Sequence, residues 1–188
     1  MPELAPRTTA LVLIDLQRGI VGMPLEPRSG EVVVSQSKGL ADRFRDAGAP
    51  VVQVRVAWSA DFADAPPRNV DQPIPQPEGG LPDDWSQFVD GLVKAGDLEI
   101  LKRQWGAFFG TELDLQLRRR GITTVVLGGI ATNFGVESTA RQAWERGYDV
   151  VVVEDACAGP SRELHEMAMT RILPRLSRVV QSADLALA

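Results

Sequence analysis

The sequence predicts an α/β protein with a doubly wound, six-stranded parallel sheet and helices on both of its faces. Three observations predict this fold class. Short apolar runs rich in valine and isoleucine recur along the 188 residues, as expected for strands that are buried on both faces. Amphipathic segments with helical spacing lie between most of these runs. Two strands joined by a crossing helix run parallel, which predicts a parallel sheet.

The first part of the chain predicts two strands with a helix between them. Residues 10–15 (ALVLID) are a strand that ends at a carboxylate, Asp15. Residues 29–47 are a helix that ends at Gly48, and residues 50–58 (PVVQVRVAW) are the next strand.

A proline-rich segment, residues 59–96, then interrupts the alternation. Its prolines forbid a long helix. A loop of this length in a compact domain usually forms or covers a site. The spacing of Trp85, Phe88 and Leu92 predicts one short amphipathic helix within it.

Residues 97–102 (DLEILK) are a third strand, which ends in another charged residue, Lys102. A helix is predicted to open at Thr111, with Asp114 as an imperfect capping-box partner. The letters LDLQL that follow fit a strand equally well, so the residues alone leave both alternatives open.

The central stretch, residues 121–155, predicts a strand, a turn, a helix and a strand. Residues 122–127 are the first strand, which Gly128 and Gly129 end. A buried strand at residues 150–153 must run parallel to it, because a helix crosses between them.

That crossing helix is predicted from Val136 onward and stops at Gly147. Its buried face follows helical spacing and comprises Val136, Thr139, Ala140, Ala143 and Trp144. The last predicted elements are a helix at residues 161–173, closed by Pro174, and a strand at residues 177–180.

Composition limits the function. We expect residues 1–188 to form one domain, long enough to bury a core without disulfides. A net charge of -5 argues against nucleic-acid binding, which needs a basic surface. The apolar run at residues 10–14 is too short for an export signal or a membrane span. The single cysteine suits a reducing compartment, so we expect a cytoplasmic protein.

The carboxyl ends of the predicted strands mark the candidate site, because open α/β sheets bind ligands at that edge. Asp15 and Lys102 each end a strand there, and residues 128–135 (GGIATNFG) join the next strand to its helix. A carboxylate with a lysine partner indicates a site more strongly than either residue does alone.

Several other polar and aromatic residues could either bind the substrate or have a structural role. Gln17 and Arg55 are candidates for binding a substrate carboxylate, but each also suits a structural ion pair or loop hydrogen bond. Trp105 and Phe108 either line the pocket or fill the core. Asn133 is either a ligand contact or a helix N-cap.

Two further residues are weak candidates for catalysis. Cys157 is expected to be a buried, inert thiol. His165, the only histidine, is expected on a helix surface far along the chain, so Thr132 and Ser138 have no evident base.

Three ordered motifs run along the chain: ALVLIDLQ, LKRQWGAFFGTEL and GGIATNFGVESTARQAWERGYDVVVVEDACAG. Together they resemble the isochorismatase-like hydrolase superfamily, also called the cysteine hydrolases. The resemblance implies a Rossmann-like sheet whose site uses an aspartate, a lysine and a cysteine at the start of the central helix. Asp15 and Lys102 match the first two residues, and Gly135 stands at the cysteine position.

The resemblance also implies a mechanism. Cysteine-bearing members such as nicotinamidases attack an amide through a thiolate, which glycine cannot do. The isochorismatases also carry glycine there and cleave a vinyl ether without a covalent intermediate. That reaction needs a general acid and water, so we expect Asp15 to be the acid, with burial offsetting the charge of Lys102.

The turn departs from that of the isochorismatases, which carry tyrosine and histidine where this chain has Ala131 and Asn133, so the substrate stays open. The family commonly has a cis peptide here, and the matching bond joins Ile130 to Ala131. We expect backbone donors at Ile130, Ala131 and Gly135 to be retained. Metal-using nicotinamidases have a histidine-containing ligand set that this chain lacks, so we predict no metal and no cofactor.

We therefore predict a hydrolase that acts on a small carboxylated substrate through Asp15 and Lys102. An inactive member that binds a metabolite or a partner is the alternative, and amidase chemistry through Cys157 is the third. The resemblance implies a homodimer or larger homo-oligomer, which the apolar Trp144 and Leu173 support.

Overall fold

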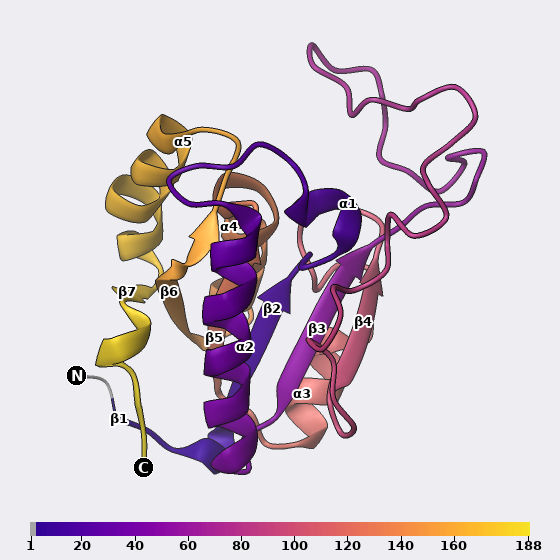
Figure 1. The fold of residues 1–188 in the computed structure, drawn as a ribbon. Coiled ribbons are helices and arrows are strands. Elements are labelled where there is room, and N and C mark those ends of the chain that lie inside the picture. The colour runs from indigo at the N-terminus through magenta and orange to yellow at the C-terminus, as the bar shows by residue number, and fades with distance from the viewer. Residues whose placement is uncertain (1–2) are drawn as a thin grey trace.

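The computed structural model describes residues 3–188, which are built around one six-stranded sheet (Figure 1). Every neighbouring pair of strands is parallel. The strands in spatial order are β4 (Leu98–Lys102), β3 (Val51–Val56), β2 (Thr9–Ile14), β5 (Thr124–Ile130), β6 (Asp149–Ala158) and β7 (Arg178–Val180). The predicted doubly wound parallel sheet is confirmed.

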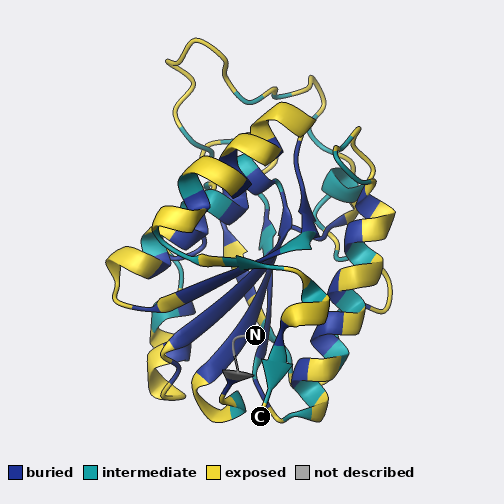
Figure 2. Cartoon of the chain, turned by 90° about the vertical axis from the view of Figure 1, so that its left-hand side faces the viewer, coloured by how far each residue is buried: buried dark blue, intermediate teal, exposed yellow. Residues whose placement is uncertain are grey.

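Helices cover both faces of the sheet, as predicted. On one face, α2 (Gly30–Asp46) contributes Val33, Leu40 and Phe44 to the core. On the other face pack α3 (Leu113–Arg119), α4 (Glu137–Glu145) and the segment after α5 (Arg162–Met167). Figure 2 shows a buried sheet between helices whose outer surfaces are exposed.

Strand β2 explains why the sheet residues are apolar on both sides. Ala10, Val12 and Ile14 belong to the core on the α3 and α4 face, whereas Leu11 and Leu13 belong to the core on the α2 face. Successive side chains of a strand point to opposite faces, and both faces are covered here. The result is a continuous apolar run.

The order of the strands places the candidate site. From β2 the chain moves outward through β3 to β4, and from β5 it moves the opposite way through β6 to β7. The direction therefore reverses between β2 and β5, and Ile14 is paired with Gly129 at their carboxyl ends. Ligands bind at such a switch point in open α/β sheets.

Strand β5 does not end at Gly128, so that part of the prediction is wrong. It continues to Ile130, with a register shift against β6 between Leu127 and Gly129. Gly129 has φ 121, and a Cβ there would lie 2.2 Å from the backbone oxygen of Ile14. Glycine extends the strand here because it accepts both the backbone angle and the close approach.

The beginning of α4 also differs from the prediction. A π-helical turn, Thr132–Val136, precedes it, and the chain turns out of the helix near Gly147, which has φ 78. The predicted inner face is buried apart from Trp144, which is 55% exposed and was wrongly assigned to it.

Helix α3 is a helix rather than the alternative strand, but it begins at Leu113 instead of Thr111. The Thr111 hydroxyl accepts a hydrogen bond from the Leu113 backbone N–H (3.2 Å). Asp114 accepts from the Tyr148 hydroxyl at 2.8 Å, so the prediction that it completes a capping box is wrong.

The predicted helix around Trp85 is absent: the backbone there forms only single turns, such as the bond from Trp85 N–H to the Pro82 carbonyl (2.9 Å), and it also bonds to residues 16–19. Arg18 N–H donates to the Gln87 carbonyl (2.9 Å), Gly19 N–H donates to the Trp85 carbonyl (3.0 Å), and Val89 N–H donates to the Leu16 carbonyl (3.2 Å). Earlier parts of the loop between β3 and β4 extend away from the sheet (Figure 1).

Two short strands near the two ends of the described chain form a second, small sheet that the sequence did not predict. It pairs β1 (Glu3–Leu4) with β8 (Ala186–Leu187) in parallel. The short helix α1 (Arg18–Val21) was not predicted either. Within residues 3–188, no helix combines the length and apolar character needed to cross a bilayer.

Candidate active site

The two charged residues predicted to form the site are in contact. Lys102 Nζ donates to Asp15 Oδ2 at 2.7 Å and to the Trp105 carbonyl at 2.8 Å. The side chains of Lys102 and Asp15 are only 2% and 7% exposed. They come from the ends of β4 and β2, which are separated by β3, so the long lysine chain reaches across the edge of the sheet.

Asp15 has an unusual backbone conformation. Its φ is 54, in the left-handed region that non-glycine residues seldom occupy, although aspartate tolerates it better than most. Its N–H donates to the Val54 carbonyl at 2.8 Å, which holds it between β2 and β3. Strained residues persist where their surroundings fix them, often at functional sites.

The environment of the Asp15 carboxyl favours its neutral form. Burial raises the pKa of Asp15 to about 6, although the charge and hydrogen bond of Lys102 act in the opposite direction. Oδ2 is bound by Lys102, whereas buried Oδ1 has no hydrogen-bond partner among residues 3–188. Such an oxygen is costly to leave unpaired, which makes it a candidate contact for a ligand.

Gly135 faces this pair. A Cβ built on Gly135 would lie 3.2 Å from Asp15 Oδ2, 3.5 Å from Lys102 Nζ and 2.8 Å from Ile14 Cγ2. A side chain at this position would therefore point at the carboxyl and the ammonium. Glycine permits this close approach, because any Cβ would be crowded by Ile14.

The turn before α4 is fixed at both ends. The Ile130–Ala131 peptide bond is cis, as predicted, and the Ala131 carbonyl accepts from the Val136 N–H at 3.2 Å. The Thr139 hydroxyl donates to the Gly135 carbonyl (2.7 Å) and accepts from the Ala107 N–H (3.1 Å). The expected backbone donors of Ile130, Ala131 and Gly135 stay a prediction.

Gln17 and Arg55 do not join the pair. Gln17 is fully buried, and its amide donates to the Val56 carbonyl (3.0 Å) and accepts from the Val56 N–H (2.9 Å). It thus links the loop after β2 to β3. The Arg55 guanidinium lies 5.7 Å from the centre of the Phe88 ring.

The aromatic candidates divide between surface and core. Phe108 is 4% exposed and packs against Tyr148, with ring centres 5.7 Å apart, so it is a core residue. Trp105 is 51% exposed and packs against Phe134 at 4.8 Å. Because the Trp105 carbonyl accepts from Lys102, this exposed aromatic pair adjoins the site.

Asn133 is not an N-cap. Ala131 occupies the cap position of the π-helical turn, without a side-chain hydrogen bond. The Asn133 Oδ1 atom is buried, lacks a hydrogen-bond partner within the described chain, and would lie 3.0 Å from a Cβ built on Gly159.

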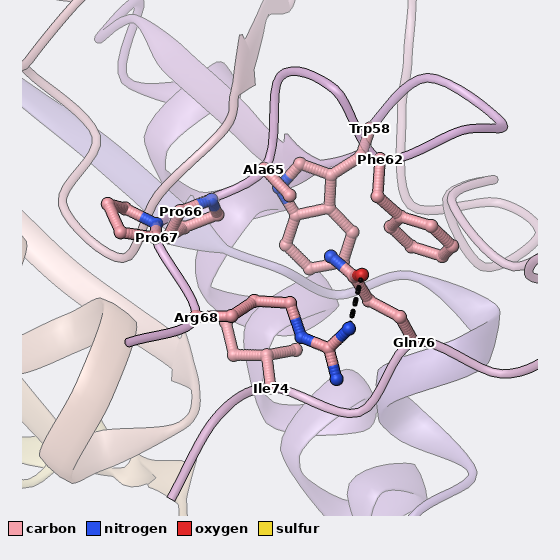
Figure 3. A pocket seen from close by; sticks show the side chains of 8 residues that line it. All are labelled: Trp58, Phe62, Ala65, Pro66, Pro67, Arg68, Ile74 and Gln76. Carbon is pink, nitrogen blue, oxygen red and sulfur yellow. Dashed lines mark hydrogen bonds between the residues drawn. The ribbon is translucent and has the colours of Figure 1, made fainter. Parts of the chain in front are cut away.

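Two cavities lie on the loop after β3, and Asp15, Lys102 and Gly135 line neither of them. One measures about 270 Å³ and includes Trp58, Phe62 and Trp85 in its wall. The other, about 10 Å³, shares Trp58 and Phe62 and is crossed by a hydrogen bond from Arg68 to Gln76 (Figure 3). Trp58 Nε1 donates to the Arg103 carbonyl at 2.7 Å, so both cavities adjoin the chain after Lys102.

The sequence interpretation of His165 is wrong. His165 is 2% exposed, with Nδ1 at 2.8 Å from Thr132 Oγ1 and Nε2 at 2.8 Å from Glu154 Oε1. Thr132 therefore has a histidine partner. Helical spacing offered a signal, because His165, Ala168 and Met169 follow the i, i+3, i+4 pattern of a buried face.

Cys157 is buried, as expected, and burial raises the pKa of its thiol to about 12. Among residues 3–188, no three histidine, cysteine, aspartate or glutamate side chains are grouped to hold a metal ion. The prediction that neither metal nor cofactor takes part stays a prediction.

Known proteins resemble the whole chain. The Isochorismatase domain matches residues 9–184. The isochorismatase family protein YecD of Escherichia coli O157:H7 is 52% identical over 95% of each chain. The ureidoacrylate amidohydrolase RutB of Acinetobacter baylyi is 31% identical over 90% of this chain and 79% of its own.

A solved structure agrees with this result. An isochorismatase family protein from Burkholderia thailandensis superposes with a TM-score of 0.89 at 48% identity, covering 98% of this chain and 96% of its own. The matched domain covers the six-stranded sheet and includes both Asp15 and Lys102. The chain belongs to the isochorismatase family of hydrolases.

Proposed function

We propose that the protein hydrolyses a small carboxylated vinyl ether by proton transfer from Asp15, without a covalent intermediate. The observation that carries this proposal is the buried Asp15 carboxyl, whose Oδ2 is held by Lys102 and whose Oδ1 is unpartnered within residues 3–188. With a pKa of about 6, it is both a competent acid and a competent conjugate base near neutral pH.

The proposed reaction consumes one water. Asp15 transfers its proton to the terminal carbon of the vinyl group, and the electrons of the C=C bond form the new C–H bond. Water then adds to the resulting oxocarbenium ion and returns a proton to the Asp15 carboxylate. The hemiketal breaks its C–O bond to give an alcohol and a ketone. No oxidation or reduction takes place.

Lys102 supports this role in two ways. Its ammonium has three donors, of which two bind Asp15 and the Trp105 carbonyl, so one is left for an oxygen of the substrate. Its buried positive charge also favours a carboxylated substrate over a neutral one.

Gly135 completes the proposal. We infer that it occupies the position at which cysteine-bearing family members carry their nucleophile. The support is geometric, since a side chain at 135 would meet Asp15 Oδ2 and Lys102 Nζ. Glycine at this position leaves no side chain that could act as a covalent nucleophile beside the acid.

A second function, binding without catalysis, is favoured by a different observation. Asp15 and Lys102 are almost fully buried, and neither lines the two cavities on the loop after β3. In a member that has lost activity, the two residues would serve as a structural ion pair. Amide hydrolysis through Cys157 is disfavoured because its thiol is buried and hard to ionise.

An assay separates these functions. Vinyl ether carboxylates are compared with amide and ureido carboxylates, the latter because RutB is named as an amidohydrolase. We expect turnover of a vinyl ether, a loss of about 10²- to 10⁴-fold in Asp15→Asn, and no loss in Cys157→Ala.

Other outcomes decide against the proposal. Amide turnover that disappears in Cys157→Ala would establish amidase chemistry instead. Failure to turn over any compound, combined with ligand-induced thermal stabilisation that Asp15→Asn abolishes, would support binding without catalysis.

The proposal extends to a homo-oligomer in the cytoplasm. Trp144 on α4 is 55% exposed and available for contact between copies, whereas Leu173 is buried and is not. Light scattering during size-exclusion chromatography measures the mass, and a value near 20.4 kDa would contradict an oligomer. The cytoplasmic location rests on the cysteine content alone.

A further inference from the structure

A second group of buried polar side chains adjoins the turn that carries Gly135, and the proposed reaction does not use it. Thr132, whose side chain is fully buried, is 2.8 Å from His165 Nδ1. The other imidazole nitrogen, Nε2, is 2.8 Å from Glu154 Oε1. The three residues come from the turn, from α5 and from β6, so the contacts join three separate elements.

Glu154 is held as a carboxylate. Burial disfavours its charge, but hydrogen bonds from Arg28, His165 and Gln181 together keep the pKa of Glu154 below its usual value. Arg28 binds Oε1 at 2.8 Å and also donates to the Glu154 carbonyl, while Gln181 donates to Oε2 at 3.0 Å. An ionised carboxylate only accepts hydrogen bonds.

The state of the imidazole follows from its two partners. Because Glu154 only accepts, Nε2 must carry the hydrogen in that bond. Burial lowers the pKa of His165, with Glu154 opposing it, so the ring is neutral at pH 7 and Nδ1 is an acceptor. The Thr132 hydroxyl therefore donates to Nδ1.

Thr132 is well placed to fix the turn. It directly follows the cis Ile130–Ala131 bond and is the first residue of the π-helical turn that presents Gly135. The other end of that turn is held by Thr139, which binds the Gly135 carbonyl. Since Thr132 has no exposure to solvent, its hydroxyl is suited to positioning rather than to attack on a substrate.

We propose that His165 is a positioning residue that couples the active-site turn to β6 through Thr132 and Glu154. The neutral ring receives the Thr132 hydrogen bond and donates to Glu154. Protonation places a hydrogen on Nδ1, reverses the bond to Thr132 and leaves the buried hydroxyl hydrogen without this acceptor. We expect the turn to shift in response. Its importance for catalysis rests on the proposed function, whereas the coupling itself is independent of any substrate.

Burial and the charged groups around His165 determine whether its pKa is raised or lowered. Glu154 on β6 and Glu166 on α5 favour the imidazolium, whereas burial and Arg28, which precedes α2, oppose it. The net effect is a pKa below the ordinary 6.5, so the coupled state is present at neutral pH and is lost as the pH falls.

Nuclear magnetic resonance tests this coupling cleanly, because the chain has one histidine. Long-range ¹H–¹⁵N spectra of the full-length protein report the tautomer of His165 and the midpoint of its titration. We expect hydrogen on Nε2 at pH 7.5 and backbone amides at residues 131–136 that shift with the His165 midpoint. The titration is repeated in Asp15→Asn, because Asp15 titrates in a nearby range.

Two variants at one position isolate the hydroxyl. Thr132→Ser keeps the donor and should keep the coupling. Thr132→Val has the same shape without the hydroxyl, so the turn amides should no longer follow the protonation of His165.

The proposal is overturned if the amide shifts of the turn do not follow the protonation of His165. It is also overturned if these amides follow it in Thr132→Val as they do in Thr132→Ser. Once a substrate is known, the acid limb of kcat/KM should move in Thr132→Val and stay in place in Thr132→Ser. If the protein turns over no substrate but the turn amides still follow His165, the proposed function is wrong and this inference remains supported.

Discussion

At the scale of the residue, Asp15 combines features that its position in the sequence only partly implies. A strand-end aspartate usually accepts hydrogen bonds from water or from a loop. Here Asp15 has a left-handed backbone conformation, and its carboxyl is buried against Lys102. Burial removes water from the carboxyl and raises its pKa to about 6. The Lys102 ammonium opposes this rise in the pKa of Asp15.

The first prediction concerns pH. If protonated Asp15 is the acid, kcat/KM for a vinyl ether should fall about tenfold per pH unit well above pH 6, while protonation of His165 governs the fall on the acid side. Lys102→Met removes the charge that lowers the Asp15 pKa, so the carboxyl midpoint should move upward, measured by ¹³C resonance.

Lys94→Met is the matched control, because that side chain is 52% exposed and pairs with Asp42. It should leave the Asp15 midpoint unchanged. A downward move in Lys102→Met would contradict the assigned role of the ammonium.

The second prediction concerns position 135. Gly135→Cys directs a thiol toward Asp15 and Lys102, and the ammonium should promote its ionisation. We expect iodoacetamide to label this variant faster than the wild type, whose only thiol is buried, while vinyl ether turnover is lost because the side chain presses on Ile14 and on the Asp15–Lys102 pair. Gly135→Ala should lose turnover without gaining a reactive thiol. Unchanged turnover in Gly135→Ala would contradict this prediction.

At the scale of the element, β5 and the turn after it depend on glycine for a reason that periodicity does not reveal. The sequence suggested that Gly128 and Gly129 end the strand, since glycine often punctuates one. In the fold, Gly129 instead lets β5 pass close to the Ile14 carbonyl and continue to Ile130. This continuation sets where the active-site turn begins.

The third prediction compares two glycines. Gly129→Ala should destabilise the protein by about 3 kcal/mol or more, because the φ of 121 and the 2.2 Å approach to Ile14 both exclude a Cβ. Gly39→Ala, in the exposed interior of α2 with nothing within 4 Å, should stabilise it by about 0.5 to 1 kcal/mol. Urea unfolding measures both. Equal effects would refute the assigned role of Gly129.

At the scale of the whole molecule, one ion pair closes the long excursion between β3 and β4. Arg45 at the end of α2 binds both carboxylate oxygens of Asp97, at 2.9 Å and 2.5 Å, just before β4 begins. Burial disfavours the charge of Asp97, but hydrogen bonds from Arg45, the Lys94 backbone and Gln53 hold its pKa below 3.8. The pair thus anchors the returning chain to the helix.

The fourth prediction follows from this pair. Asp97→Asn should destabilise the protein by about 1 to 3 kcal/mol, since it removes the buried charge partner of Arg45 and leaves only the exposed one, Asp42. Asp42→Asn removes an exposed partner of the same arginine and should cost less than about 1 kcal/mol.

Acid unfolding gives a second readout. Because the folded pKa of Asp97 is lowered, its contribution is present above about 3.8 and is lost as the pH falls through the folded value. Urea unfolding at pH 7 and pH 3 should therefore show a smaller difference between Asp97→Asn and the wild type at pH 3. A larger difference there would refute this assignment.

The fold was largely predictable because local patterns and the global topology agree. Each strand of the large sheet carries a short apolar run, and helices α2 and α4 carry a 3.6-residue period. The errors fall where tertiary contacts override local preference. Trp85 and its neighbours bond to residues 16–19 instead of forming a helix, and Asp114 binds Tyr148 instead of capping α3.

The candidate site was predictable to a similar degree. Asp15 and Lys102 were found from the sequence because both stand at strand ends, and parallel strands bring those ends to one edge. The contact between Thr132 and His165 was missed because the two residues are 33 positions apart, and only the packing of α5 brings them together.

The sequence by itself determined the parallel sheet and the identity of the residues at its carboxyl edge, because apolar periodicity and chain connectivity suffice for these. Only the tertiary structure decided that the Asp15 carboxyl is buried with one oxygen unpaired, that position 135 faces it, and that His165 lies behind the turn. Those properties depend on the exclusion of water and on distances between elements, which no local pattern encodes.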